Sequence, residues 1–138
     1  MSEDFHLNHV DPDVLAGPFM VYNHMELVRS DPQSSIIKVE LRPESKNLHG
    51  VAHGGLLGAM ADCAAGVTAR AGGEDYITLS SHYSFLRNTR SGTVYARADT
   101  VRRGRQIAVF HVTVYDEKET LLMDGSVEMI HRENRPQE

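Results

Sequence analysis

The sequence lacks the features that mark secreted, disulfide-stapled or membrane-spanning proteins. It contains one cysteine, Cys63, which cannot form a disulfide within a single chain. It has no run of about 18 apolar residues that could cross a membrane as a helix, and its polar, acidic first residues are unlike a secretion signal. We therefore expect a cytoplasmic protein with no membrane partner.

The composition is typical of one compact globular domain. The chain has 138 residues, of which 41% are hydrophobic and 24% are charged. A chain of this length buries roughly two thirds of the surface that its unfolded form exposes, so its core needs no disulfide or structural metal. We predict a single domain over residues 1–138, with poorly ordered polar tails at 1–12 and 132–138.

The formal net charge is −5, which argues against a nucleic-acid partner, but one segment is basic. The segment between positions 87 and 105 contains six of the fourteen Lys and Arg residues and a single acid, Asp99. The last three of these arginines surround Gly104, where a turn would gather guanidinium and backbone N–H groups. They are Arg102, Arg103 and Arg105. The cluster is either a solvated strand face and loop or a binding site for a ligand phosphate.

From position 34 onward the sequence has the pattern of β-strands, whereas residues 13–30 show no clear pattern. Ile37, Val39 and Leu41 alternate with charged residues, which predicts a half-buried strand that Pro43 ends. Similar patterns predict four further strands, at about 76–86, 93–102, 106–115 and 121–131. Because their connections are short, we expect consecutive strands to be antiparallel neighbours. These connections are residues 90–92, 103–105 and 116–119.

One segment has the composition of a helix. Residues 54–69 contain five alanines and four glycines, no proline and one charged residue, Asp62. Glycine weakens a helix by up to about 1 kcal/mol relative to alanine, so four glycines suggest that another element packs close to the helix axis. The sheet is available for this packing. We therefore predict an α+β fold in which an antiparallel sheet of five to six strands curls around one long central helix.

The loop before this helix ends in a pair of glycines. Gly54 and Gly55 would leave the first N–H groups of the helix uncovered, at the end where the helix dipole favours negative charge. Such groups would stabilise the oxyanion of a reacting carbonyl. The alternative is that the glycines only allow a tight turn or close packing.

Asp62 is a carboxylate in the middle of an otherwise apolar helix. A buried, unpaired carboxylate is costly, so such a residue is normally hydrogen-bonded or faces a cavity. It would act as a nucleophile or general base at a carbonyl group, unless its role is only structural. A helix N-terminus and a nearby acid are the two components that acyl transfer requires, which favours the catalytic interpretation.

Other chemical arrangements are weaker. His49 and His53 have the spacing of zinc ligands on a helix, but the glycines around them indicate a loop and no third ligand is suitably spaced, so we expect no metal. Ser80 or Ser81 with His82 and the helix acid could form a triad, but no Gly-x-Ser-x-Gly elbow is present. The sequence has neither a Walker phosphate loop nor a dinucleotide fingerprint, so no cofactor is expected.

A longer pattern spans about residues 34–131. It runs from Asn47 and Gly50 through His53-Gly54-Gly55 and Asp62 to a strand that ends Tyr83-Ser84-Phe85-Leu86-Arg87. In this pattern the chain resembles hotdog-fold acyl-CoA thioesterases of the phenylacetate-pathway (PaaI-like) subfamily, in the 4-hydroxybenzoyl-CoA thioesterase superfamily. The resemblance implies that acyl-CoA is the substrate, that two subunits join their sheets edge to edge, and that such dimers commonly pair into tetramers.

The resemblance also implies roles for individual residues. Asp62 would be the catalytic carboxylate, and the Gly54 N–H would polarise the thioester carbonyl. Asn47 would position the carbonyl or the water, and His53 would line the site or help orient it. Substrate would also meet Gly55 and a polar residue on the strand near the acid, for which the candidates are Thr78, Ser80 and Ser81. The expected contacts of the CoA phosphates are Arg87, Arg103, Gly104 and Arg105.

Two functions fit this pattern. The first is hydrolysis of acyl-CoA, and the second is a non-catalytic module that binds or senses acyl-CoA. Asp62 and the lack of a DNA-binding extension favour the enzyme. A hydratase acting on enoyl thioesters would need a histidine and acid pair for proton transfer, which the central helix lacks. The acyl group itself cannot be predicted, because the resemblance implies that a pocket at a subunit interface determines it.

Helix geometry places the Gly54 N–H and the Asp62 carboxylate too far apart to act on one thioester within a single chain. Gly54 and Asp62 lie eight residues apart, which corresponds to about 12 Å along a helix. A thioester carbon about 3 Å from an attacking oxygen, with its carbonyl oxygen about 3 Å from an N–H donor, cannot easily bridge that distance. We therefore expect each site to take Asn47 and Gly54 from one subunit and Asp62 from its partner across a two-fold axis.

Overall fold

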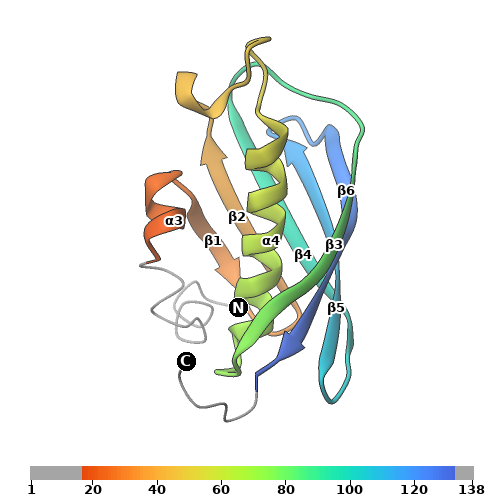
Figure 1. The fold of residues 1–138 in the computed structure, drawn as a ribbon. Coiled ribbons are helices and arrows are strands. Elements are labelled where there is room, and N and C mark those ends of the chain that lie inside the picture. Colours follow the sequence, from red (N-terminus) through yellow and green to blue (C-terminus); the bar gives the residue numbers. More distant parts are fainter. Residues whose placement is uncertain (1–16, 133–138) are drawn as a thin grey trace.

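The computed structural model describes residues 17–132, in which a long helix lies across one face of a curled six-stranded antiparallel sheet (Figure 1). The helical elements are α3 (Pro18–Tyr22), a 3-10 turn (Pro43–Ser45) and α4 (Gly54–Arg70). The strands are β1 (Glu26–Ser30), β2 (Ser34–Glu40), β3 (Tyr76–Phe85), β4 (Thr93–Arg103), β5 (Ile107–Asp116) and β6 (Leu121–His131). The predicted α+β architecture is confirmed. The predicted tails, apart from residue 132, lie outside the described residues, and no helix within 17–132 is long and apolar enough to cross a membrane.

The strands follow the sequence pattern with two differences. The first is β1, which pairs with β2 in the region where no pattern was visible. The second is the position of β3: the sheet order is β1-β2-β4-β5-β6-β3, so the expectation that β3 and β4 are neighbours is wrong. Their connection spans residues 86–92 and crosses the open end of the sheet (Figure 1). There it is held to the loop before α4, because Ala52 N donates to the Thr89 carbonyl at 3.0 Å.

The core lies between α4 and the sheet. On the helix, Leu57, Met60, Ala61 and Ala64 are fully buried. On β5 the predicted alternation is confirmed, with one face buried completely: Ala108, Phe110, Val112 and Val114. Each large apolar side chain buried in this way contributes about 1.5–3 kcal/mol. The alanines allow the helix axis to approach the sheet closely, as the composition predicts.

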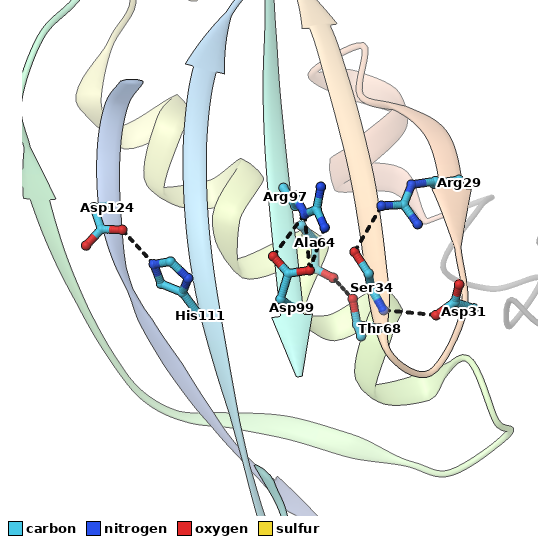
Figure 2. Close-up of polar contacts among 9 residues, drawn as sticks. All are labelled: Arg29, Asp31, Ser34, Ala64, Thr68, Arg97, Asp99, His111 and Asp124. Atoms are coloured by element: carbon cyan, nitrogen blue, oxygen red, sulfur yellow. Dashed lines mark hydrogen bonds and ion pairs between the residues drawn. The ribbon is translucent and has the colours of Figure 1, made fainter. Parts of the chain in front are cut away.

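The opposite face of the sheet is polar. Figure 2 shows that Arg97 reaches Asp99 along β4, with Nε donating to Oδ2 at 2.9 Å. It also shows the His111 ring against Asp124 on the adjacent strand, at 2.6 Å between Nε2 and Oδ1. These four side chains are paired with one another on the face of the sheet that points away from α4.

Candidate active site

Helix α4 begins with an unoccupied backbone donor. His53 is its N-cap, and the Nδ1 atom of that ring accepts a hydrogen bond from Gly55 N at 2.8 Å. Within residues 17–132, no acceptor lies at the N–H of Gly54. A first-turn N–H at the positive end of the helix dipole is suited to a developing oxyanion.

Asn47 shapes the loop that leads into the helix. Its Oδ1 accepts a hydrogen bond from His49 N at 2.9 Å, and its backbone N donates to the Val51 carbonyl at 2.9 Å. Gly50 has a φ of +77°, a left-handed conformation that glycine adopts at little cost. The Nδ2 group of Asn47 has no acceptor in the described part of the chain, so it is available to a ligand.

Asp62 lies two turns further along α4 and is held by β3. The Thr78 hydroxyl donates to Asp62 Oδ1 at 2.6 Å. The Asp62 side chain is half-buried in the single chain rather than fully buried. The hydrogen bond fixes one carboxylate oxygen, and Oδ2 is left for water or substrate.

Small residues at four-residue spacing bring α4 close to β3. A Cβ atom on Gly54 would lie 3.4 Å from Phe85 Cε1, and one on Gly58 would lie 3.2 Å from Tyr83 Cε2. Asp62 continues this line of the helix and meets Thr78. The line therefore runs antiparallel to β3, with Gly54 at the Phe85 end and Asp62 at the Thr78 end.

Two cavities lie on the side of α4 that faces α3. The upper cavity, of about 600 Å³, lies at the start of the helix and includes His53, Gly55 and the aromatic side chains of Phe19 and Tyr22. The lower cavity, of about 390 Å³, includes Asp62 and is walled by Phe19, Met20, Cys63, Gly66, Arg70, Asp75 and Met129. No pattern in the sequence marked the wall residues from α3. Arg70 was not predicted either, although its spacing of eight residues from Asp62 already places both on one side of a helix.

The thiol next to Asp62 is not activated. Burial and, to a lesser extent, the negative charge of Asp62 together raise the pKa of Cys63 to about 11, against a smaller opposing effect of Arg70. A thiol with such a pKa is almost entirely protonated at neutral pH, and the thiolate is the reactive form. Cys63 is therefore a wall of the lower cavity rather than a nucleophile.

The structure separates the three polar candidates on β3. Thr78 contacts Asp62, whereas Ser80 Oγ donates to Glu128 Oε1 on β6 at 2.9 Å. Ser81 hydrogen-bonds the hydroxyl of Tyr83, which lies against the helix. No hydrogen bond joins His82 to the acid in the described part of the chain, and residues 17–132 contain no group of three potential metal ligands.

The basic segment is divided between the two ends of the molecule. Arg87 follows β3, near the start of α4, whereas the turn from Arg103 to Arg105 lies beyond β4, an eleven-residue strand. Eleven residues of strand span about 36 Å. The single basic region of the sequence is therefore two separate regions in the fold.

Arg103 is engaged within the chain. Its guanidinium donates to the carbonyls of Thr68 at 2.8 Å, Ala69 at 3.2 Å and Pro32 at 3.0 Å. It thereby covers the last carbonyls of α4, where a positive charge also complements the helix dipole. Arg102 and Arg105 are exposed, so they are the cations of this turn that can meet a ligand phosphate.

The comparisons with known proteins agree with this architecture. A family model of the thioesterase superfamily matches residues 49–123. The chain therefore belongs to the thioesterase superfamily, and its fold is the hotdog fold. Rv1847 of Mycobacterium tuberculosis, provisionally named an esterase, is 28% identical over 125 residues, which cover 86% of this chain and 89% of that protein. Its solved structure superposes with a TM-score of 0.81, covering 86% of this chain and 99% of the other.

Two more distant structures share the fold. A hypothetical thioesterase of Streptococcus pneumoniae, solved with coenzyme A, is 20% identical with a TM-score of 0.76 over 85% of this chain and 99% of the other. The Escherichia coli PaaI protein of the phenylacetic acid degradation operon is 17% identical with a TM-score of 0.78, covering 83% of each chain. At these identities the likeness shows the fold alone, so the phenylacetate-pathway subfamily stays a prediction.

Proposed function

We propose that this protein hydrolyses acyl-CoA thioesters to a carboxylic acid and free CoA. The observation that carries the proposal is that one helix presents both a free oxyanion donor, the Gly54 N–H, and a carboxylate that Thr78 orients. Membership of the thioesterase superfamily supports it. The coenzyme A in the pneumococcal structure of the same fold supports the choice of thioester. The closer assignment to the phenylacetate-pathway subfamily rests on the His53-Gly54-Gly55 and Asp62 pattern, and a cytoplasmic location stays a prediction.

Asp62 begins the reaction in one of two ways. As a general base it takes a proton from a water molecule, whose oxygen then bonds to the thioester carbon. As a nucleophile its own oxygen forms that bond, and water hydrolyses the resulting anhydride. In both routes the carbonyl oxygen gains negative charge beside the Gly54 N–H, the C–S bond breaks, and the departing CoA thiolate takes up a proton. Asn47 and His53 position the carbonyl or the water.

The free edge of β3 is the proposed dimer contact. β3 ends the sheet, and no strand within residues 17–132 pairs with its outer edge. It is ten residues long and carries the exposed apolar side chains of Ile77, Leu79 and Phe85. A long, apolar, unpaired edge favours pairing with another chain. We propose that a second copy of the chain pairs with it to form a homodimer, which then pairs into a dimer of dimers.

Such pairing would assemble the two halves of each site. A two-fold axis near the middle of β3, at about Ser81 and His82, sets the Thr78 end of one strand beside the Phe85 end of its partner. Asp62 accompanies the Thr78 end and Gly54 the Phe85 end. Asp62 of one subunit thus comes to Gly54 of the partner subunit, which removes the separation of about 12 Å within one helix.

The remaining contacts are assigned as follows. Gly55 lines the upper cavity, which we assign to the substrate, and Thr78 holds the acid. Ser80 and Ser81 stay predictions as substrate contacts. We propose Arg87, Gly104 and Arg105 as contacts of the CoA phosphates. Because about 36 Å of strand separates the two regions in one chain, a single CoA would meet both only if they came from different subunits.

The proposal is tested by measuring hydrolysis across a panel of aromatic, short-chain and medium-chain acyl-CoAs. On the best substrate, Asp62→Asn is expected to lower kcat at least about 100-fold, as is usual on removal of a general base. The fold and the CoA affinity should be unchanged, as checked by circular dichroism and calorimetry. Retention of more than a tenth of kcat would exclude Asp62 as the principal catalyst. Tight binding of acyl-CoA without hydrolysis by the parent would instead indicate the binding or sensing module.

A further inference from the structure

The lower cavity contains a cation as well as the proposed catalytic acid. Arg70 lies eight residues beyond Asp62 on α4, with Gly66 halfway between them. Residues at this spacing share one side of a helix, and each step of four residues rises about 6 Å. All three residues line the cavity of about 390 Å³. The guanidinium therefore lies below the acid along the wall of one cavity.

The Arg70 guanidinium is held in place at one edge and open at the other. Its Nε and Nη2 atoms donate to the Tyr76 carbonyl, at 3.2 and 2.8 Å. Its Nη1 atom lies over the helix, 2.8 Å from the position that a Cβ on Gly66 would occupy. Nη1 has no acceptor within residues 17–132. The absence of a side chain on Gly66 thus allows a donor to point along the cavity wall toward Asp62.

The other walls fit a short carbon chain. Phe19, Met20 and Met129 supply apolar surface to the same cavity. A second acid, Asp75, also lines the cavity, but Arg132 Nε lies 3.8 Å from its Oδ2 and offsets its charge. The cavity thus combines a reacting group, apolar walls and a guanidinium donor further along the same helix.

We propose that this cavity holds the acyl group, and that the preferred acyl groups carry a carboxylate at the end remote from the thioester, which Arg70 binds. The inference rests on the proposed function, because it takes Asp62 as the group that faces the thioester carbon. The preferred substrates are then CoA esters of short dicarboxylic acids. Guanidinium groups match carboxylates in geometry and charge, and such hydrogen bonds are stronger than neutral ones.

The test compares two substrates of equal carbon number, glutaryl-CoA and pentanoyl-CoA, which differ in a terminal carboxylate against a methyl group. The parent is expected to show a kcat/KM at least about 10-fold higher for glutaryl-CoA, the size of effect of one charge-assisted hydrogen bond. Arg70→Met is expected to remove this preference while changing kcat/KM for pentanoyl-CoA less than about threefold. Arg29→Met, an arginine of β1 that contacts Ser34, is the matched control and should keep the preference.

Gly66→Ala provides a second variant that keeps the arginine. The added methyl group would displace the Nη1 atom, which is the mobile end of a long side chain, so the fold is preserved and only the preference falls. Equal kcat/KM values for the two substrates in the parent would overturn this inference and leave the proposed function standing. Loss of activity toward both substrates in Arg70→Met, with the preference unchanged in Gly66→Ala, would also overturn it. Absence of hydrolysis of any acyl-CoA by the parent would overturn both proposals.

Discussion

Thr78 donates its hydroxyl hydrogen bond to Asp62 Oδ1 at 2.6 Å, across the contact between β3 and α4. The bond determines which carboxylate oxygen faces the open side of the helix. It also joins the proposed catalytic acid to the strand that we propose as the dimer edge. A substitution in β3 that removes this hydrogen bond should therefore alter the orientation of the Asp62 carboxylate.

We expect Thr78→Val to lower kcat about tenfold, because a hydrogen bond to a charged group is worth about 1.5 kcal/mol. KM should change little, since the hydroxyl orients the acid rather than the substrate. Thr78→Ser keeps the hydroxyl and should restore most of kcat. Steady-state kinetics on the best acyl-CoA measure both values. Equal rates for the valine and serine variants would show that the hydrogen bond has no part in orienting the acid.

Substitution of Arg103 should lower the stability of the fold, whereas substitution of Arg105 should weaken substrate binding. Arg103→Met removes the guanidinium from three backbone carbonyls and should lower the free energy of unfolding by about 3 kcal/mol. Arg105→Ala removes an exposed cation and should raise KM with kcat nearly unchanged, an effect that added salt reduces. Urea denaturation and kinetics at low and high salt separate the two. A stable Arg103→Met variant with a raised KM would contradict this assignment.

Much of the fold could be predicted because its signals are local. Alternation on the strands and a small-residue helix each follow from neighbouring residues, and both are confirmed. The position of β3 could not be predicted. Residues 90–92 have the composition of a tight turn between neighbouring strands, but the whole connection spans residues 86–92 and crosses over to a strand that is not a neighbour. The edge strand β1 was missed because a bulge between Leu27 and Arg29 interrupts its alternation.

Two assignments within the site also depend on β-bulges: which polar residue of β3 contacts the acid, and which way Arg103 points. Simple alternation would place Thr78 and Ser80 on one face of β3, but a register shift between them turns Thr78 to Asp62 and Ser80 to Glu128. A second shift, between Thr100 and Arg102, changes the parity of β4 and turns Arg103 inward to the end of α4. A bulge moves every later side chain to the other face. No residue type in the sequence marks either bulge, so these orientations required the structure.

The raised pKa of Cys63 predicts slow alkylation of the folded protein. At pH 8 a thiol with a pKa of about 11 has roughly one hundredth of the thiolate of a thiol at the ordinary value of 9.0. Iodoacetamide should therefore label folded protein about 100-fold more slowly than protein unfolded in urea, as mass spectrometry can follow. Asp62→Asn removes the second cause of the shift and should accelerate labelling modestly. Equal rates for folded and unfolded protein would contradict the assignment.

The same shift predicts a loss of stability at alkaline pH. A thiol whose pKa is raised on folding favours the folded state fully below the unfolded value of 9.0. The contribution is lost as the pH rises from there through about 11, because the unfolded chain releases its proton first. Urea denaturation between pH 8 and 11 measures the loss, and Cys63→Ala should not show this component. A parent and variant with parallel pH profiles would refute it.

The last prediction concerns the assembly of each site from two chains. We expect Asn47→Ala and Asp62→Asn homodimers to be inactive, since each lacks one half of every site. When the two chains are co-assembled in equal amounts, half of the dimers are mixed. In a mixed dimer one site receives both substitutions and the other receives neither. Activity should therefore recover to about a quarter of the parent level, as half of the sites in half of the dimers.

The geometry behind this outcome is the antiparallel run of the Gly54 to Asp62 line along β3. If each site lay within one chain, every mixed dimer would contain only singly substituted sites, and no activity would return. Mass spectrometry of intact dimers establishes that mixed dimers have formed. A co-assembly of Asp62→Asn with Thr78→Val is the matched control, because both changes fall in the same half of the site and each mixed dimer keeps one damaged acid in each site. The activity of this control mixture should not exceed the average of the two variant homodimers. Recovery only in the mixture of Asn47→Ala with Asp62→Asn would therefore locate Asn47 and Asp62 of one site on different subunits.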